Sequence, residues 1–295
     1  MTLLRRSASL LVWLLIAVAA FGFATTEAVA EVVSKYGAWQ LGPQAPYSPV
    51  AEQTIEFWNV LLVIIILIAV FVLGLMAYVC VRFKASNNPT PTKTTHNTLI
   101  EVLWTAVPVL ILVVIAVPSF KLLYFMDHAV DPEMTIKVNG QQWSWNYEYP
   151  DDAVSFDSLL LEPDEIKDGQ TYLLDVDNPL VLPVGKRVQI LLASDNVMHS
   201  FFVPSLMLQI YTTPGRTNET WVQVTEPGTF YGQCNQICGT GHSYMPIVIK
   251  ALSEADYAAW LKKAKVEFAM DGTVRPVQMA VARQPGQVTM PVSDR

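Results

Sequence analysis

The hydrophobic residues of this chain gather in three blocks near its N-terminal end. In the first block, Arg5 and Arg6 precede an apolar stretch from Leu10 to Phe21, and small residues follow as far as Ala30. A charged start, a short apolar centre and an A-x-A ending are typical of a secretory signal peptide, so residues 1–30 are predicted to be a cleaved leader. The alternative is a first membrane helix, for which this apolar run is short.

The second and third blocks are long enough to cross a bilayer. Residues 55–81 and 99–125 are almost wholly apolar, and about 20 helical residues span the hydrocarbon layer of a membrane. The loop between them, residues 82–98, carries three basic residues, so the positive-inside rule places it in the cytoplasm. Residues 31–54 then lie on the outer side, and their three prolines predict an extended periplasmic segment.

From Asp131 onward the pattern changes to short alternating segments. Aromatic and polar residues alternate from Gln142 to Tyr149, which is typical of a strand. The other strand candidates, separated by Pro/Gly turn signals, are Met134–Val138, Val188–Ala193, Thr220–Val224, Thr229–Gln233 and Ile247–Ala251. Several short strands without intervening helices predict an all-β sandwich or barrel over residues 131–266.

The end of the chain is expected to be a helix followed by a tail. Ser253 is a good N-cap for a helix that ends near Val266. Residues 267–295 show no periodicity, and we expect them to be a mobile tail.

Composition narrows the classes of function. Apolar residues make up 52% of the chain and charged residues only 15%, against roughly 25% charged in an average soluble protein. A net charge of −7 makes nucleic acid an unfavourable partner and favours a cationic protein instead. The odd number of cysteines, three, argues against a disulfide framework.

The densest chemistry is a C-x3-C-x3-H-x2-M motif formed by Cys234, Cys238, His242 and Met245, with one further histidine, His199, after an earlier strand candidate. Thiolate, imidazole and thioether donors together suit copper. A mononuclear blue-copper site takes one cysteine. Two cysteines in one loop could instead bridge two copper ions, each capped by one histidine.

Three other interpretations of this motif compete. Cys234 and Cys238 could form a disulfide, because the periplasm is oxidising. They could hold zinc tetrahedrally together with His199 and His242. Met245 could simply be a core residue. The ligand types alone leave these alternatives open.

From about Pro49 to Lys265 the chain resembles subunit II of the haem–copper cytochrome c oxidases of alphaproteobacteria and mitochondria. The motifs that carry the resemblance, in the family's order, are Thr95-His96-Asn97 with Glu101–Pro108, Gln142–Tyr149, Asn196–Phe201, Pro214–Arg216 and Tyr231–Ile247. The resemblance implies two transmembrane helices and a cupredoxin-like β domain that carries the dicopper centre CuA. It implies these copper ligands: the side chains of His199, Cys234, Cys238, His242 and Met245, and the backbone carbonyl of Gln236.

The resemblance also implies partners and a path for electrons and protons. Trp143 would receive electrons from cytochrome c, and the copper centre would pass them to haem in subunit I, which also holds CuB and reduces oxygen. Glu101 would lie at the mouth of the K proton pathway into subunit I, although an interfacial carboxylate at that depth is also harmless. Subunit III and membrane lipid are further expected neighbours, in a bacterial inner membrane with the β domain in the periplasm.

Acidic residues around the aromatic segment are candidates for docking a lysine-rich cytochrome c, although a run of charges is commonly only a solvated face. They are Glu148, Asp151, Asp152, Asp157 and Asp195. Two departures from the family pattern affect other contacts. Gln236 replaces the usual glutamate, so a magnesium ion shared with subunit I is doubtful. Gln209 and Tyr211 replace the usual lysine and aspartate near the expected contact with subunit I.

Three rival functions deserve comparison. A quinol-oxidase subunit II has the same fold but lacks the copper ligands that this chain carries. A membrane-tethered copper carrier would need neither Glu101 nor the Trp143 segment. The CuA domain of a nitrous oxide reductase would not carry the helical hairpin.

Overall fold

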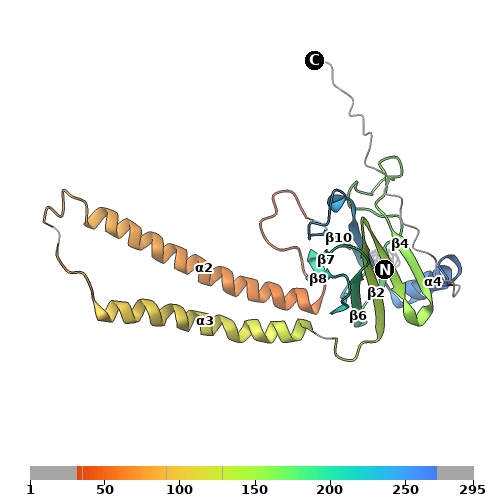
Figure 1. Cartoon of the computed structure of the whole chain (residues 1–295), viewed down its shortest axis with the longest axis horizontal. Helices are drawn as coiled ribbons and strands as arrows, with labels where there is room; N and C mark the ends of the chain where they lie inside the picture. Colours follow the sequence, from red (N-terminus) through yellow and green to blue (C-terminus); the bar gives the residue numbers. More distant parts are fainter. Residues whose placement is uncertain (1–31, 35, 91, 128, 271–295) are drawn as a thin grey trace, which may run out of the picture. The chain divides into compact units, whose positions relative to one another are not determined.

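The computed structural model describes residues 32–34, 36–90, 92–127 and 129–270. The predicted leader, residues 1–30, lies outside this part of the chain. Two long helices, α2 (Pro49–Arg82) and α3 (Thr98–Asp127), are joined by a loop and lie in the sequence between a short first strand and the rest of a β domain (Figure 1). Both helices are long and apolar enough to cross a membrane, as the hydrophobic blocks predicted.

Helix α2 begins at Pro49, six residues before the predicted apolar block. Ser48 explains this start, because its hydroxyl accepts a hydrogen bond from the backbone N–H of Ala51 and proline is well tolerated in a first helical turn. The Ser48 hydroxyl also donates to the carbonyl of Leu206 in the β domain. Residues 49–54 are therefore helical, and the prediction that they are extended was wrong, since the cap decides the start and hydropathy does not.

The β domain contains two sheets. In the first, the strand order is β5-β11-β10-β7-β8, and β1 also pairs with β10 in parallel. In the second, the order is β4-β3-β2-β6-β9. The strands are β1 Val32–Ser34, β2 Met134–Gln141, β3 Ser144–Tyr149, β4 Val154–Ser158, β5 Leu180–Pro183, β6 Val188–Ser194, β7 His199–Val203, β8 Leu208–Thr212, β9 Asn218–Val222, β10 Gly228–Cys234 and β11 Pro246–Leu252.

The two sheets pack face to face around one apolar core, which makes the domain a β-sandwich. Along β6, Val188, Ile190 and Leu192 are buried while the residues between them are partly exposed. The aromatic rings of Trp145 and Phe201 link the two sheets, with ring centroids 5.1 Å apart in an edge-to-face arrangement. The predicted all-β fold is thus confirmed.

The aromatic residues of β3 form part of this core. Trp145, Tyr147 and Tyr149 are all fully buried. Trp145 and Tyr147 are therefore core residues. Trp143 differs from them because it lies in the turn between β2 and β3 and is half-buried.

The C-terminal helix α4 (Glu254–Glu267) starts as predicted, with the Ser253 hydroxyl accepting a hydrogen bond from the N–H of Asp256. The chain after it continues to pack. Phe268 lies against Phe156 with ring centroids 4.9 Å apart, and residue 269 forms an isolated bridge to β4. The tail was predicted to begin too early, and residues 271–295 lie outside the described part of the chain.

Candidate metal centre

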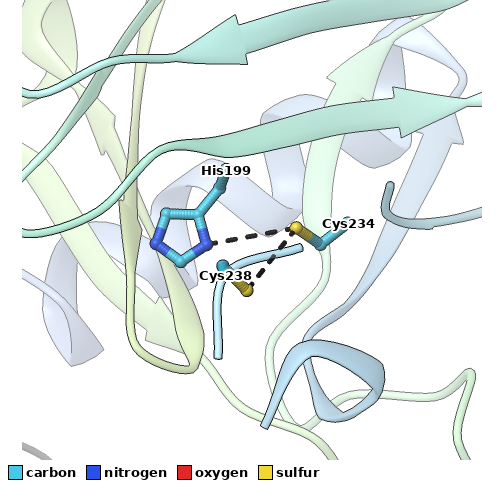
Figure 2. A group of neighbouring side chains, drawn as sticks. All are labelled: His199, Cys234 and Cys238. Carbon is cyan, nitrogen blue, oxygen red and sulfur yellow. Dashed lines mark hydrogen bonds between the residues drawn. The ribbon is translucent and has the colours of Figure 1, made fainter. Parts of the chain in front are cut away.

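The sandwich brings the predicted ligands together at one end. Strand β10 ends at Cys234 and β7 begins at His199, and the two strands are neighbours in register, with Cys234 opposite Phe201. The loop of residues 235–245 then connects β10 to its antiparallel partner β11. Figure 2 shows that the side chains of His199, Cys234 and Cys238 point toward one another.

Six donor atoms lie close together, and each of them is within 4.0 Å of a cysteine sulfur. The Sγ atoms of Cys234 and Cys238 are 3.9 Å apart. The remaining distances are 4.0 Å from His199 Nδ1 to Cys234 Sγ, 3.5 Å from His242 Nδ1 to Cys238 Sγ, 3.6 Å from Met245 Sδ to Cys238 Sγ, and 3.3 Å from the Gln236 carbonyl to Cys234 Sγ. The structure thus gathers every ligand that the motif predicted.

This geometry fits metal ions better than a disulfide. Both cysteines are free, and their sulfur separation is far longer than the S–S bond of about 2.05 Å. Since metal–thiolate bonds are about 2.3 Å long, an ion can touch both sulfurs at once. The donor atoms of His199, Cys234 and Cys238 all lie within 4.8 Å of one another. A structural zinc site uses four donors, whereas the thioether of Met245 adds a further soft donor that copper accepts.

Burial sets the protonation of the donors. His199 is fully buried, and burial, with a smaller effect of His242, lowers the pKa of its imidazole to about 4. Burial, and then the neighbouring Cys234, raises the pKa of the Cys238 thiol to about 12. At neutral pH the histidine is therefore ready to bind a metal ion, while binding to Cys238 must release a proton.

The fully buried Trp145 contacts two of the candidate metal ligands, a role that the sequence did not reveal. Its indole N–H donates to the carbonyl of Met245 at 3.1 Å, and its ring packs edge-to-face against His199 with centroids 6.0 Å apart. One core side chain thus connects a ligand on β7 with a ligand in the loop before β11. The alternation in β3 could have indicated that Trp145 faces the core.

Trp143 lies beside the metal-binding loop. The neighbouring Gln142 donates from Nε2 to the carbonyl of Cys238 at 2.8 Å, which ties the β2–β3 turn to the loop. The indole of Trp143 itself packs on the edge of the core.

The predicted docking acids are spread along the second sheet. Glu148 lies on β3 and forms an ion pair with Lys137 at 2.8 Å, and Asp157 accepts a hydrogen bond from Asn146. Asp195 follows β6 at the metal end, where it accepts from Gln141.

The other two acids, Asp151 and Asp152, lie at the far end. They follow the last residue of β3, whereas the turn that holds Trp143 precedes its first. Six strand residues separate these ends, a span of about 20 Å. Asp152 is moreover paired with Lys265 at 2.8 Å.

A further acidic loop is hydrogen-bonded to β10 next to Cys234. Residues 159–179 connect β4 to β5, and the backbone carbonyl of Leu173 accepts a hydrogen bond from Gln233, the neighbour of Cys234. The loop has one lysine, Lys167, and six acids: Glu162, Asp164, Glu165, Asp168, Asp175 and Asp177. The first four of these acids are exposed. The sequence shows this density of acids, but not the hydrogen bond that joins their loop to β10.

Glu101 lies in the first turn of α3. Its carboxylate accepts a hydrogen bond from the backbone N–H of Asn97 at 3.3 Å, so it helps to cap the helix. It also borders an open groove of about 470 Å³ whose lining is Thr98, Glu101, Val102, Thr105, Ala106 and Val109. This groove leaves the side of the helix available to a neighbouring protein.

Fold and site together define a membrane-anchored β-sandwich protein with a candidate copper centre made from two cysteines. The family described as cytochrome c oxidase subunit II, periplasmic domain, matches residues 134–252, and the transmembrane domain of the same subunit matches residues 37–122. The chain therefore belongs to the cytochrome c oxidase subunit II family, and it is a subunit of an oxidase complex with its β domain outside the membrane.

The relatives with similar sequences agree with this assignment. A probable cytochrome c oxidase subunit 2 of Rickettsia prowazekii is 48% identical over 225 residues, which cover 76% of this chain and 72% of the relative. Cytochrome c oxidase subunit 2 of Phytophthora megasperma is 42% identical over 236 residues, covering 78% and 88%. The crystal structure of the periplasmic domain of subunit II (CoxB) of Bradyrhizobium japonicum is 40% identical, with a TM-score of 0.45, and covers 48% of this chain and all of that domain.

Proposed function

We propose that this chain takes electrons from cytochrome c at a binuclear CuA centre and passes them to haem in subunit I, which reduces oxygen while the complex pumps protons. The observation that carries this proposal is the pair of free thiols 3.9 Å apart, flanked by two imidazole Nδ1 atoms, a thioether and a backbone carbonyl. Two thiolates and two histidines would hold a pair of copper ions, and the thioether of Met245 with the carbonyl of Gln236 would complete the donor set.

The protein's own contribution is a rigid set of donors that changes little between oxidation states. His199 and Cys234 are held by neighbouring strands, and Met245 is fixed through Trp145. Burial of His199, Cys234 and Cys238 keeps water from the sulfurs. When bound, the copper pair would supply a one-electron redox couple, and no proton has to move at these residues.

Trp143 and the acids at the metal end provide the place where cytochrome c would bind. Trp143 is half-buried beside the copper loop, so a docked haem protein can reach its exposed part. Asp195 and the acidic loop of residues 159–179 favour a lysine-rich partner there. Glu148 and Asp157, on the face of the sheet, would attract a cationic partner more weakly. Asp151 and Asp152 would attract it least, because they lie farthest from the metal site.

The remaining assignments concern the assembled complex in a bacterial inner membrane, with the β domain in the periplasm. Subunit I, subunit III and lipid would cover the exposed apolar helices α2 and α3. Glu101 would deliver protons to subunit I from the groove on α3. Gln236 offers only a neutral amide to a magnesium ion at the interface, a weaker ligand than carboxylate.

Metal analysis of the purified complex tests the proposal. We expect two copper ions for each chain in addition to CuB, and an electron paramagnetic resonance spectrum in which one unpaired electron is shared by two copper nuclei. Zinc in this site, one copper ion per chain, or a Cys234–Cys238 disulfide in the active complex would contradict the proposal.

A further inference from the structure

The indole of Trp143 presses against two glycines of the metal-binding loop. A Cβ atom built on Gly241 would lie 2.3 Å from Cδ2 and 2.5 Å from Cγ of the indole. A Cβ on Gly239 would lie 2.9 Å from Cζ2 of the same ring. Carbon atoms in contact stand about 3.5–4.0 Å apart, so the ring and the loop are closer than any side chain at residue 241 would permit.

The two glycines differ in what their backbone requires. Gly239 has φ of +129°, a conformation that other residues rarely adopt. Gly241 has φ of −90° and ψ of 15°, which other residues do adopt. The backbone therefore accounts for glycine at residue 239 but not at residue 241. What excludes a side chain at residue 241 is the indole of Trp143.

Neighbouring residues on both chain segments fix the contact between Trp143 and Gly241. Gln142, next to Trp143 in the chain, donates to the carbonyl of Cys238 at 2.8 Å. On the other side of the loop, Gly241 directly precedes His242, whose Nδ1 lies 3.5 Å from the Cys238 sulfur. The indole thus rests on the short stretch of chain between two copper ligands.

We propose that Gly241 is a positioning residue for electron uptake. Its missing side chain lets Trp143 lie in direct contact with the loop between Cys238 and His242, and this contact keeps the gap from indole to metal short. Electronic coupling falls steeply with such a gap, so a side chain at residue 241 slows uptake without changing the ligands. The inference rests on the proposed role of Trp143, in which one electron leaves the ferrous haem of cytochrome c and the copper pair gains it.

The test is Gly241→Ala in the assembled oxidase complex. We expect unchanged copper content, an unchanged copper resonance spectrum and an unchanged KM for cytochrome c. The rate of copper reduction by cytochrome c should fall severalfold, because electron transfer slows exponentially as the gap between the indole and the metal widens. The matched control is Gly42→Ala, because a Cβ there meets no atom within 4 Å, and it should keep the parental rate.

A double-mutant cycle with Trp143→Ala distinguishes the positioning role of Gly241 from the proposed electron uptake through Trp143. Once the indole is gone, adding Gly241→Ala should slow the reaction no further. A parental rate in Gly241→Ala beside a slow Trp143→Ala overturns the positioning role alone. Loss of copper in Gly241→Ala, or equal slowing with and without the indole, also overturns it. Parental rates in both single variants remove Trp143 as the electron port, and the proposed uptake route fails with it.

Discussion

Nε2 of His199 lies 3.4 Å from Oδ1 of Asn196, three residues earlier in the chain. The same oxygen accepts the backbone N–H of Val197 at 2.7 Å, which fixes the amide. A proton on Nε2 can therefore point at Asn196 while Nδ1, on the side of Cys234, keeps its lone pair for a metal ion. Asn196 thus selects the tautomer that a copper ligand needs.

Replacing Asn196 should weaken copper binding without unfolding the domain. In Asn196→Leu the imidazole loses its acceptor, and we expect copper affinity to fall by about ten- to hundredfold, as for other residues that orient a metal-binding histidine. Asn196→Asp keeps an acceptor and should bind copper close to the parental level. Competition with a copper chelator measures both, and equal affinity in all three proteins would show that Asn196 has no such role.

The sequence predicted elements with long apolar runs or clear alternation, but not all of them, since β4 was missed although its burial alternates, and β8 was missed too. The membrane helices were predicted from their long apolar runs. Strands β2 and β6 were also predicted, and both alternate in burial. Strands β5 and β7 were missed because they are buried on both faces and show almost no alternation. The three-residue β1 was missed because it depends on pairing with β10, nearly two hundred residues away.

The candidate site was predictable as a list of ligands but not as an arrangement. Alternation placed Trp143 and Trp145 on one face, yet Trp143 lies in the turn after β2 and Trp145 in β3. Trp143 packs on the copper loop, and Trp145 is buried in the core, where it donates to the carbonyl of Met245. No pattern in the sequence assigned a role to Gly241. The reason for a glycine there is a ring from another part of the chain, which no local pattern contains.

Removal of one bridging sulfur should abolish the paired centre. In Cys238→Ser we expect the resonance signature of shared copper to disappear and oxidation of cytochrome c to fall to background, since serine is a poor ligand for copper and cannot bridge as a thiolate does. Cys80→Ser is the matched control, because Cys80 lies on α2 far along the chain from the site. Retention of the paired signal in Cys238→Ser would refute a bridging role for this thiol.

The metal-free protein should lose stability in mild acid through His199. Its pKa is about 4 in the folded state and 6.5 ordinarily, so the unfolded chain binds the extra proton between these values. The free energy of unfolding therefore falls as the pH drops from about 6.5 to about 4 and is unaffected by this group above that window. Urea unfolding of the metal-free chain and of His199→Gln at several pH values measures the difference. A parent that tracks the variant through this window would contradict the prediction.

Cytochrome c should depend on the acids at the metal end more than on those at the far end. Amide replacement of Glu162, Asp164, Glu165 and Asp168 removes four exposed charges from the loop beside Cys234. We expect kcat/KM for cytochrome c to fall by about tenfold at low ionic strength, through slower association, and its dependence on salt to flatten. The control is Asp151→Asn with Asp152→Asn, a pair at the opposite end of β3. Those charges lie beyond the screening length of about 8–10 Å from the site, so a loss in the control as large as in the loop variant would place the docking surface elsewhere.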